Sequence, residues 1–198
     1  MYQFIESIKL LDGKFFRVEL HQERINQIFD AFFPDKKKIS LTELIKYQAF
    51  PKKGFFKTRV VFNEEVKILE FVPYKIPNIK TLKVVETDIE TAFYKSANRD
   101  KINRVFAKKE DCDDVLFVKN GFFTDTSYCN VALFDGENWF TPKTPLIYGT
   151  QRKNLINNKQ ILEKEIHISK IYNYQSICLF NAMIEFGEIV FSTNSIKM

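Results

Sequence analysis

Histidine is scarce in this sequence, which contains only His21 and His167 among 198 residues. Two histidines leave little material for a histidine-based metal site or for a Ser-His-Asp catalytic triad. The three cysteines, Cys112, Cys129 and Cys178, are odd in number and lack the spacing of a metal site. This usage is typical of reduced thiols in a cytoplasm. We therefore expect no metal site and a cytoplasmic location.

Long apolar runs and a dominant charge are also missing. No stretch approaches the ~20 apolar residues that a membrane-spanning helix needs, and residues 1–7 carry no cleavage-type signal. The 30 basic and 25 acidic residues give a net charge of +5 and a mixed surface. The densest basic run, residues 36–38, is typical of a solvated loop. We therefore expect neither a membrane nor a nucleic acid as a partner.

The turn signals and the apolar periodicity predict hairpins with helices set between them. Strands are expected at 4–10 and 15–20, 57–62 and 66–72, 115–118 and 122–126, 131–134 and 139–141, and 176–181 and 188–192. Helices are expected at 21–33, 40–49, 98–109 and 150–165. Because hairpins dominate, we expect the α+β class with mainly antiparallel sheets. The boundary between two lobes, 1–85 and 86–198, is expected near residue 85.

Four short segments carry the chemistry: His21-Gln-Glu-Arg24, Tyr94-Lys95-Ser96, Thr124-Asp125-Thr-Ser-Tyr-Cys-Asn130-Val131 and Gly149-Thr150-Gln151-Arg152. In this order and at these separations, they resemble the class IV aminotransferases. These pyridoxal-5'-phosphate (PLP) enzymes include D-amino-acid and branched-chain aminotransferases and 4-amino-4-deoxychorismate lyase. The resemblance covers residues 4–190 and implies a short form of PLP fold type IV. It also implies two lobes of mainly antiparallel sheet with flanking helices.

Lys95 is the candidate lysine for the Schiff base with the cofactor aldehyde. A reactive lysine must give up its proton, which partial burial promotes. Apolar residues surround Lys95 in the sequence. The resemblance favours it over an ordinary surface lysine, because in the family the lysine stands just ahead of a helix and about thirty residues before the acidic segment. Lys101 and Lys83 are the alternatives.

The resemblance gives the pyridine nitrogen a partner in Asp125, with Asn130 beside it. A buried carboxylate keeps that nitrogen protonated, so that the ring can accept electrons. The family usually has Glu at position 125, and the Asp is shorter by one methylene. Arg24 is the candidate phosphate ligand, and the alternative is an ion pair with an Asp or Glu of the protein itself. His21 is interpreted as a packing residue.

The second phosphate contact is expected where residues 149–152 begin a helix. Free amides at a helix N-terminus bind anions, and glycine lets the backbone approach closely. The candidate residues are Gly149, Thr150 and Gln151. Gln151 replaces the usual hydroxyl, which Thr150 is expected to supply. Asn181 and Ala182 resemble a second phosphate-side turn of the family.

The resemblance implies a PLP-dependent lyase that converts 4-amino-4-deoxychorismate into 4-aminobenzoate, a folate precursor, and pyruvate. The short chain and residues 63–65, in place of the substrate loop of longer relatives, favour this reaction. A class IV aminotransferase acting on branched-chain or D-amino acids is the first alternative. A non-catalytic binding module derived from the same fold is the second. The expected partners are a small-molecule amino substrate and a second copy of the chain in a homodimer.

Overall fold

The structure is a computed structural model that describes residues 3–198. The chain forms two compact units. Unit 1 consists of Met1–Ile76 and Phe93–Asn98, and unit 2 consists of Pro77–Ala92 and Arg99–Met198. The chain returns to unit 1 for six residues because the segment around Ser96 pairs with the first strand. A division of function at residue 85, which falls within unit 2, stays a prediction.

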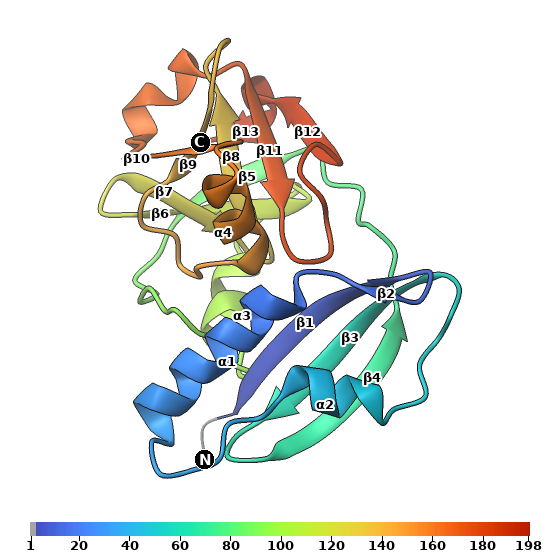
Figure 1. Cartoon of the computed structure of the whole chain (residues 1–198). Coiled ribbons are helices and arrows are strands. Elements are labelled where there is room, and N and C mark those ends of the chain that lie inside the picture. Colours follow the sequence, from blue (N-terminus) through green and yellow to red (C-terminus); the bar gives the residue numbers. More distant parts are fainter. Residues whose placement is uncertain (1–2) are drawn as a thin grey trace. The chain divides into compact units, whose positions relative to one another are not determined.

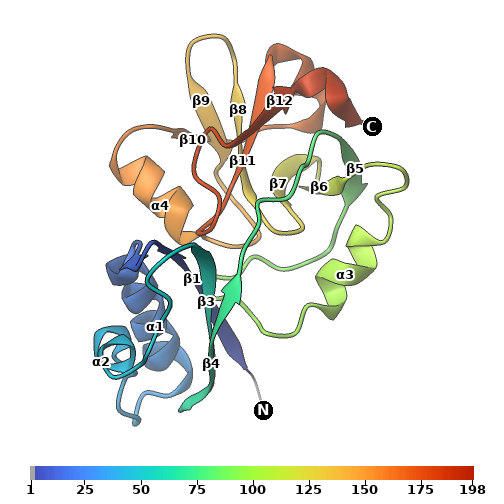
Figure 2. The same cartoon turned by 90° about the vertical axis from the view of Figure 1, so that its right-hand side faces the viewer.

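Unit 1 is an antiparallel sheet with two helices. Its strands are β1 (Phe4–Leu11), β2 (Lys14–Phe15), β3 (Phe55–Phe62) and β4 (Val66–Pro73), in the order β2-β1-β3-β4. Helices α1 (Val18–Phe32) and α2 (Leu41–Lys46) lie on the same side of this sheet (Figures 1 and 2).

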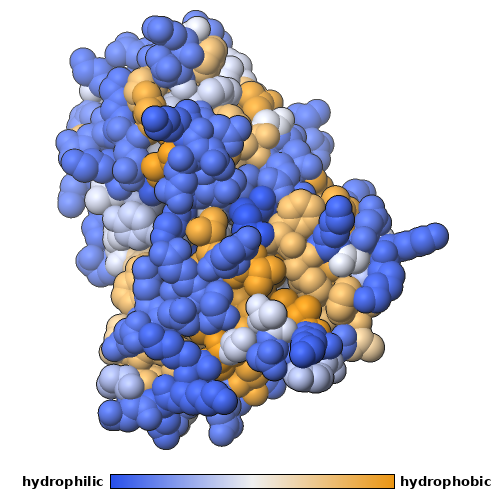
Figure 3. All heavy atoms as spheres, viewed as in Figure 1, coloured by the Kyte–Doolittle hydropathy of each residue, from blue (hydrophilic) through white to orange (hydrophobic). Residues whose placement is uncertain are grey.

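The core of unit 1 lies between the helices and the sheet. It is a buried cluster of Phe4, Ile8, Ile25, Ile28, Phe29, Leu41, Val60 and Phe62. Hydrophobic residues also reach the surface of this unit over the sheet (Figure 3). The half-buried rings of Phe15, Phe50 and Phe71 contact one another with centroid separations of 4.9–6.4 Å.

Two boundaries in unit 1 differ from those expected. The strand predicted at 15–20 ends at Phe15, because Arg17 adopts a left-handed conformation (φ 55°) and α1 begins at Val18. The predicted start of the second helix is confirmed, since the Ser40 hydroxyl accepts a hydrogen bond from Glu43 N at 3.3 Å. That helix ends at Lys46, three residues earlier than expected.

Unit 2 is built on a mixed sheet of nine strands. They are β5 (Leu82–Glu86), β6 (Asp114–Lys119), β7 (Phe122–Thr126), β8 (Asn130–Phe134), β9 (Trp139–Pro142), β10 (Leu162–Lys164), β11 (Ser176–Phe180), β12 (Ile189–Ser192) and β13 (Ile196–Lys197). The main path runs β10-β9-β8-β7-β6-β5-β13, and β11 pairs with β8 and β12. Pairs β5–β6, β5–β13 and β9–β10 are parallel, and the other pairs are antiparallel.

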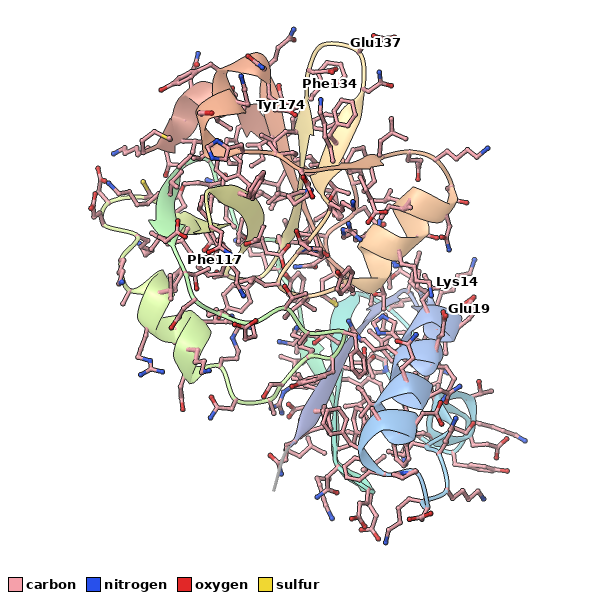
Figure 4. The ribbon with its side chains drawn as sticks, turned by 90° about the vertical axis from the view of Figure 1, so that its left-hand side faces the viewer. Lys14, Glu19, Phe117, Phe134, Glu137 and Tyr174 are labelled. Carbon is pink, nitrogen blue, oxygen red and sulfur yellow. The ribbon has the colours of Figure 1, made fainter. Side chains whose placement is uncertain are left out.

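The helices of unit 2 are short. They are α3 (Asp100–Phe106), α4 (Thr150–Asn157), and the 3-10 turns η1 (Ile168–Asn173) and η2 (Thr193–Ser195). Figure 4 shows Phe117 inside this unit and Glu137 at the tip of the β8–β9 hairpin. None of the helices in residues 3–198 has the length and apolar character needed to cross a lipid bilayer.

The helix predicted at 150–165 was wrong in its second half. α4 ends at Asn157, Lys159 takes a left-handed conformation (φ 55°), and the chain continues as β10 parallel to β9. Of the four residues predicted to face the core, Leu155, Ile161 and Ile166 are buried, whereas Leu162 is 47% exposed. Leu155 lies on α4, Leu162 begins β10, and Ile161 and Ile166 lie in the connections on either side of β10. The spacing of the hydrophobic residues alone did not distinguish one long helix from a short helix followed by a strand.

Candidate functional site

Lys95 lies in the unit 1 segment that pairs with the start of β1. Ile5 N donates to Lys95 O at 2.9 Å, and Ala97 N donates to Gln3 O at 2.9 Å. The neighbouring Tyr94 packs its ring against those of Phe4 and Phe32, each with a centroid separation of 5.3 Å. The backbone bonds and the aromatic contacts therefore hold the half-buried Lys95 in a defined place.

Arg24 lies on α1 and forms an ion pair with Glu6 of β1. Arg24 Nε donates to Glu6 Oε1 at 2.7 Å, and Arg24 Nη2 donates to Glu6 Oε2 at 2.6 Å. This is the ion pair that the sequence left open as the alternative for Arg24. The phosphate role of Arg24 stays a prediction, since the fork to Glu6 uses two of its three nitrogen atoms.

His21 completes a buried group with Glu6 and Arg24. His21 Nδ1 lies 2.5 Å from Glu6 Oε2, and neither side chain is exposed. Burial raises the pKa of Glu6, but Arg24 and His21 outweigh it and lower that pKa to about 2. Burial lowers the pKa of His21, so the neutral ring donates its Nδ1 proton to the Glu6 carboxylate. Glu6 thus orients both α1 residues of the predicted motif.

Asp125 and Asn130 are register partners on β7 and β8 of unit 2. Asn130 Nδ2 donates to Asp125 Oδ1 at 2.8 Å and to Ile147 O at 2.8 Å. Ile147 N donates to Asp125 Oδ2 at 2.9 Å. Each oxygen of the buried carboxyl group therefore accepts a hydrogen bond, and a carboxylate has lone pairs for a further donor.

Burial is the main influence on the charge of Asp125. It raises the pKa of this carboxyl group to about 7, although Ile147 N–H, the Asn130 amide and the charge of Arg152 oppose the shift. A protonated ring nitrogen beside Asp125 would favour the carboxylate by opposite charge. Buried acids with raised pKa values are frequent at functional sites.

Gly149 precedes α4 and is in close contact with Asn130. A Cβ atom at position 149 would lie 2.1 Å from Asn130 Oδ1, so the packing requires glycine here. The N-cap has no side-chain hydrogen bond, and the first turn of α4 contains no acidic residue. The first-turn amides of a helix lack intrahelical acceptors, which makes this end suitable for an anion.

The first three residues of α4 are buried. Gln151 Nε2 donates to Glu185 Oε2 at 2.8 Å, so this amide is already committed to a protein carboxylate. Arg152 Nη2 donates to Pro142 O at 2.8 Å and to Glu163 Oε1 at 2.6 Å. Thr150 therefore remains the candidate hydroxyl, and Gln151 offers an anion its backbone N–H and the second N–H of its side-chain amide.

Asn181 joins the turn between β7 and β8 to its own loop. Its Nδ2 donates to Tyr128 O at 3.1 Å, and its Oδ1 accepts from Met183 N at 2.7 Å and from Ile184 N at 3.0 Å. Asn181 and the adjacent Ala182 are half-buried. The side chain of Asn181 therefore shapes the loop, and its proposed phosphate contact stays a prediction.

The candidate residues of unit 1 and those of unit 2 are each suited to groups of PLP. Unit 2 supplies a buried carboxyl group with unused lone pairs and a helix N-terminus without acidic residues, which suit a ring nitrogen and a phosphate. Unit 1 supplies Lys95 and the buried Arg24. The sequence did not single out Glu6, Ile147 or Glu185. A charged residue between apolar neighbours in a strand was the one available signal for Glu6.

Comparison with known proteins gives the family. Residues 57–190 match the model of the amino-transferase class IV family. An uncharacterized protein of Haemophilus influenzae is 31% identical over 92% of this chain and 98% of its own length. A protein of Schizosaccharomyces pombe named "Putative aminodeoxychorismate lyase" is 31% identical over 59% of this chain and 54% of its own.

Solved structures agree with this family. A crystal structure of a "putative 4-amino-4-deoxychorismate lyase" from Haemophilus somnus superposes with a TM-score of 0.86 at 28% identity, covering 93% of this chain and 98% of that one. An aminotransferase from Brucella abortus with bound PLP gives a TM-score of 0.71 at 16% identity, covering 93% and 79%. This second likeness shows the fold alone.

The chain therefore belongs to the class IV aminotransferase family. The predicted family and the α+β class are confirmed. Membership makes the chain an enzyme, lyase or aminotransferase, of the class that uses PLP.

Proposed function

We propose that this enzyme is a lyase that converts 4-amino-4-deoxychorismate into 4-aminobenzoate and pyruvate. The observation that carries the proposal is the likeness to the lyase-named protein of H. somnus, which extends over nearly the full length of both chains. Residues 63–65 support it, since they form a tight connection between β3 and β4 where longer relatives carry a substrate loop. On this proposal the chain serves folate biosynthesis.

When bound, PLP supplies an aldehyde for amines and a ring that accepts electrons from a breaking bond at Cα. Lys95 would hold the aldehyde through its amine, and its Nζ would accept the proton from the substrate Cα. Asp125 is proposed to hold the ring nitrogen protonated through its carboxylate.

Arg24 and the first turn of α4 are proposed to bind the phosphate. Arg24 offers a buried guanidinium oriented by Glu6, and α4 offers backbone amides that follow Gly149. Asn130, Thr150, Gln151, Asn181 and Ala182 complete the proposed cofactor set.

An aminotransferase reaction is the second candidate, because it needs the same residues and is the activity that names the family. Incubation with PLP and 4-amino-4-deoxychorismate distinguishes the two. For a lyase, we expect release of 4-aminobenzoate and pyruvate in equal amounts when no 2-oxo acid has been added. Product formation only when a 2-oxo acid is added would assign an aminotransferase.

The same preparation tests the third candidate, a non-catalytic module. An enzyme of this class takes up PLP with an absorbance band near the visible edge, and borohydride makes the attachment permanent. A colourless protein that takes up no added PLP would favour the module.

A further inference from the structure

Asp125 lies at an irregular point of the sheet of unit 2. The register of β6 and β7 shifts by one residue here, so that Thr124 and Asp125 of β7 both lie opposite Phe117 of β6. Such a β-bulge interrupts the ladder locally and changes the direction of the side chains next to it. The pairing with β6 therefore holds Asp125 less firmly than a regular ladder would. Its position also depends on what holds the chain that follows.

The chain that follows is the turn of residues 126–129, which leads to Asn130, the register partner of Asp125. Thr126 N donates to Cys129 O at 2.8 Å, and Cys129 N donates to Thr126 Oγ1 at 3.0 Å. These two bonds close the turn on itself and do not attach it to the rest of unit 2. The attachment comes from residues outside the hairpin.

Arg99 provides one attachment. It directly precedes α3, and its Nη2 donates to Ser127 O at 2.7 Å. Its guanidinium group also lies over the ring of Tyr128, with Cζ 4.1 Å from the ring centroid. One planar group thus binds the main chain at residue 127 and stacks on the side chain of residue 128. Arginine can form both contacts at once because its N–H donors lie in the plane that stacks.

The contacts of Arg99 are directed to this turn. Within residues 3–198 its half-buried side chain forms no ion pair with a carboxylate, and its buried Nε has no hydrogen-bond partner there. Asn181 binds the next carbonyl group, since its Nδ2 donates to Tyr128 O at 3.1 Å. Two residues that are distant in sequence therefore hold consecutive carbonyl groups of the turn that joins Asp125 to Asn130.

We propose that Arg99 is a positioning residue that holds the turn of residues 126–129 and, through it, the Asp125 carboxyl group at the ring nitrogen of the cofactor. The inference rests on the proposed role of Asp125. One peptide bond joins Asp125 to the turn, so a displaced turn moves its carboxyl group. A charge-assisted hydrogen bond weakens steeply when its geometry changes. Arg99 touches neither cofactor nor substrate in this proposal and acts only through Asp125.

The test uses the full chain, purified without cofactor, and two ligands. One is PLP, and the other is its analogue in which a C–H group replaces the ring nitrogen. The ratio of the two affinities, called here the preference for PLP, measures the contact at the ring nitrogen, because the other groups of the ligands are the same. Titrations followed by absorbance give both dissociation constants for the wild type, Arg99→Gln, Arg99→Lys and Asp125→Asn. Arg104→Gln is the matched control, since Arg104 is an exposed arginine of α3 and its removal changes the net charge equally.

We expect the wild type to prefer PLP and Arg99→Gln to lower this preference by roughly 5- to 30-fold, as the weakening of one charge-assisted hydrogen bond predicts. The affinity for the analogue should not change. In an Asp125→Asn background, Arg99→Gln should have no further effect on the preference, because both changes act on one contact. Arg99→Lys should retain part of the preference, since an ammonium group can still donate to Ser127 O. Arg104→Gln should match the wild type.

Circular dichroism checks that each variant folds. If Arg99→Gln does not fold, Tyr128→Ala replaces it in the test, because it removes the stacking contact and leaves the bond to Ser127 O. Tyr128 is 60% exposed, so the truncation leaves no large cavity. This variant should lower the preference for PLP by roughly 2- to 5-fold, as the loss of an exposed cation–π contact predicts.

An unchanged preference in Arg99→Gln, where Asp125→Asn removes the preference, would overturn the inference and leave the proposed role of Asp125 standing. Equal losses of affinity for both ligands would also overturn it, because Arg99 would then support the whole site. A preference that survives in Asp125→Asn would reject the proposed role of Asp125 and the inference with it. An Arg99-dependent preference in a protein that releases no 4-aminobenzoate would support the inference and reject the proposed lyase reaction.

Discussion

Asp125 is a buried carboxyl group whose charge depends on what lies beside it. Its pKa is raised to about 7, so between pH 3.8 and 7 the folded protein binds a proton that the unfolded chain has released. Without cofactor, stability should therefore fall as pH rises through this window and stay low above it. A protonated ring nitrogen would reverse this penalty by pairing with the carboxylate.

Asp125→Asn should separate the effect of the buried charge on stability from its effect on the cofactor ring. Without cofactor, the variant should lose the fall in stability that the wild type shows between pH 4 and pH 8, because an amide does not ionise. Its NH2 group cannot accept from Asn130 Nδ2 or from Ile147 N, so the loss of one hydrogen bond offsets part of the gain at pH 8. With cofactor it should keep the absorbance band but lose most turnover, because an amide cannot hold the ring nitrogen protonated by charge. Urea unfolding at both pH values and steady-state rates provide the measurements. Glu137→Gln at the exposed hairpin tip is the control, and a turnover within about threefold of the wild type would place the role elsewhere.

Lys95→Ala should abolish the absorbance band and all turnover while the fold persists, because only an amine at this position can attach the aldehyde. Lys95→Arg should fail equally, since a guanidinium stays protonated. Circular dichroism checks the fold. A surviving band would assign the attachment to the exposed Lys101, because Lys83 is engaged with Glu110 at 3.1 Å and with Met198 O at 3.1 Å.

Motif spacing was informative for residues whose partners are close in sequence. Asp125 and Asn130 are five residues apart, and the structure joins them directly. Glu6 was not predicted, because its contacts to His21 and Arg24 exist only after β1 packs against α1. A residue whose role depends on such distant contacts leaves little signal in a single sequence.

The contact between β1 and α1 contains a buried charge, the Glu6 carboxylate, in addition to its apolar core. The pKa of Glu6 is lowered to about 2 from 4.5, so its stabilisation is complete above pH 4.5 and is lost as pH falls toward 2. Glu6→Gln should therefore destabilise the protein by about 3 kcal/mol at neutral pH and by much less near pH 2. Because Arg24 loses its orienting partner, PLP affinity should fall as well. Denaturant unfolding and PLP titration measure both effects, and unchanged PLP affinity in a folded variant would exclude Arg24 from the phosphate site.

The start of α4 depends on the close approach of Gly149 to Asn130. Gly149→Ala should displace Asn130, weaken its bond to Asp125 and cost about 1–3 kcal/mol of stability. In an Asn130→Ala background the same substitution should cost much less, since the clashing oxygen is gone. A double-mutant cycle by urea unfolding measures this coupling. Additive costs would show that the two residues act independently.

Turn chemistry and capping predicted many of the elements. The Asn120-Gly121 and Asp135-Gly136 hairpins form as expected, and Ser40 caps its helix. Two predicted boundaries were wrong, because contacts with distant parts of the chain outweighed the local preference for strand or helix. Arg17 starts α1 in a left-handed conformation without a glycine, and residues 162–164 join β9 instead of extending α4. The sequence has no glycine at Arg17, and the one local signal for the end of α4 is its C-cap, Asn158.

The return of the chain to unit 1 is a feature of the whole molecule. Phe93–Asn98 belongs to unit 1, where Ser96 pairs with Phe4 of β1 and brings Lys95 to the edge of that strand. Strand addition by a segment of six residues has no signature in composition or hydropathy. The proposed cofactor residues therefore come from two compact units, with Lys95 and Arg24 in one and Asp125, Asn130 and Gly149 in the other.

The family resemblance predicts a homodimer, in which the partner subunit completes each active site. A chain of 198 residues has little other means of covering a large cofactor. The contact should be two-fold symmetric and should bury on the order of 2,000 Å² or more, as obligate dimers do. Sedimentation velocity at micromolar concentration, with turnover measured in the same preparation, gives the result. A dimer that remains intact on dilution and carries the activity is the expected outcome. A stable monomer with full activity would contradict the prediction, because each site would then be complete within one chain.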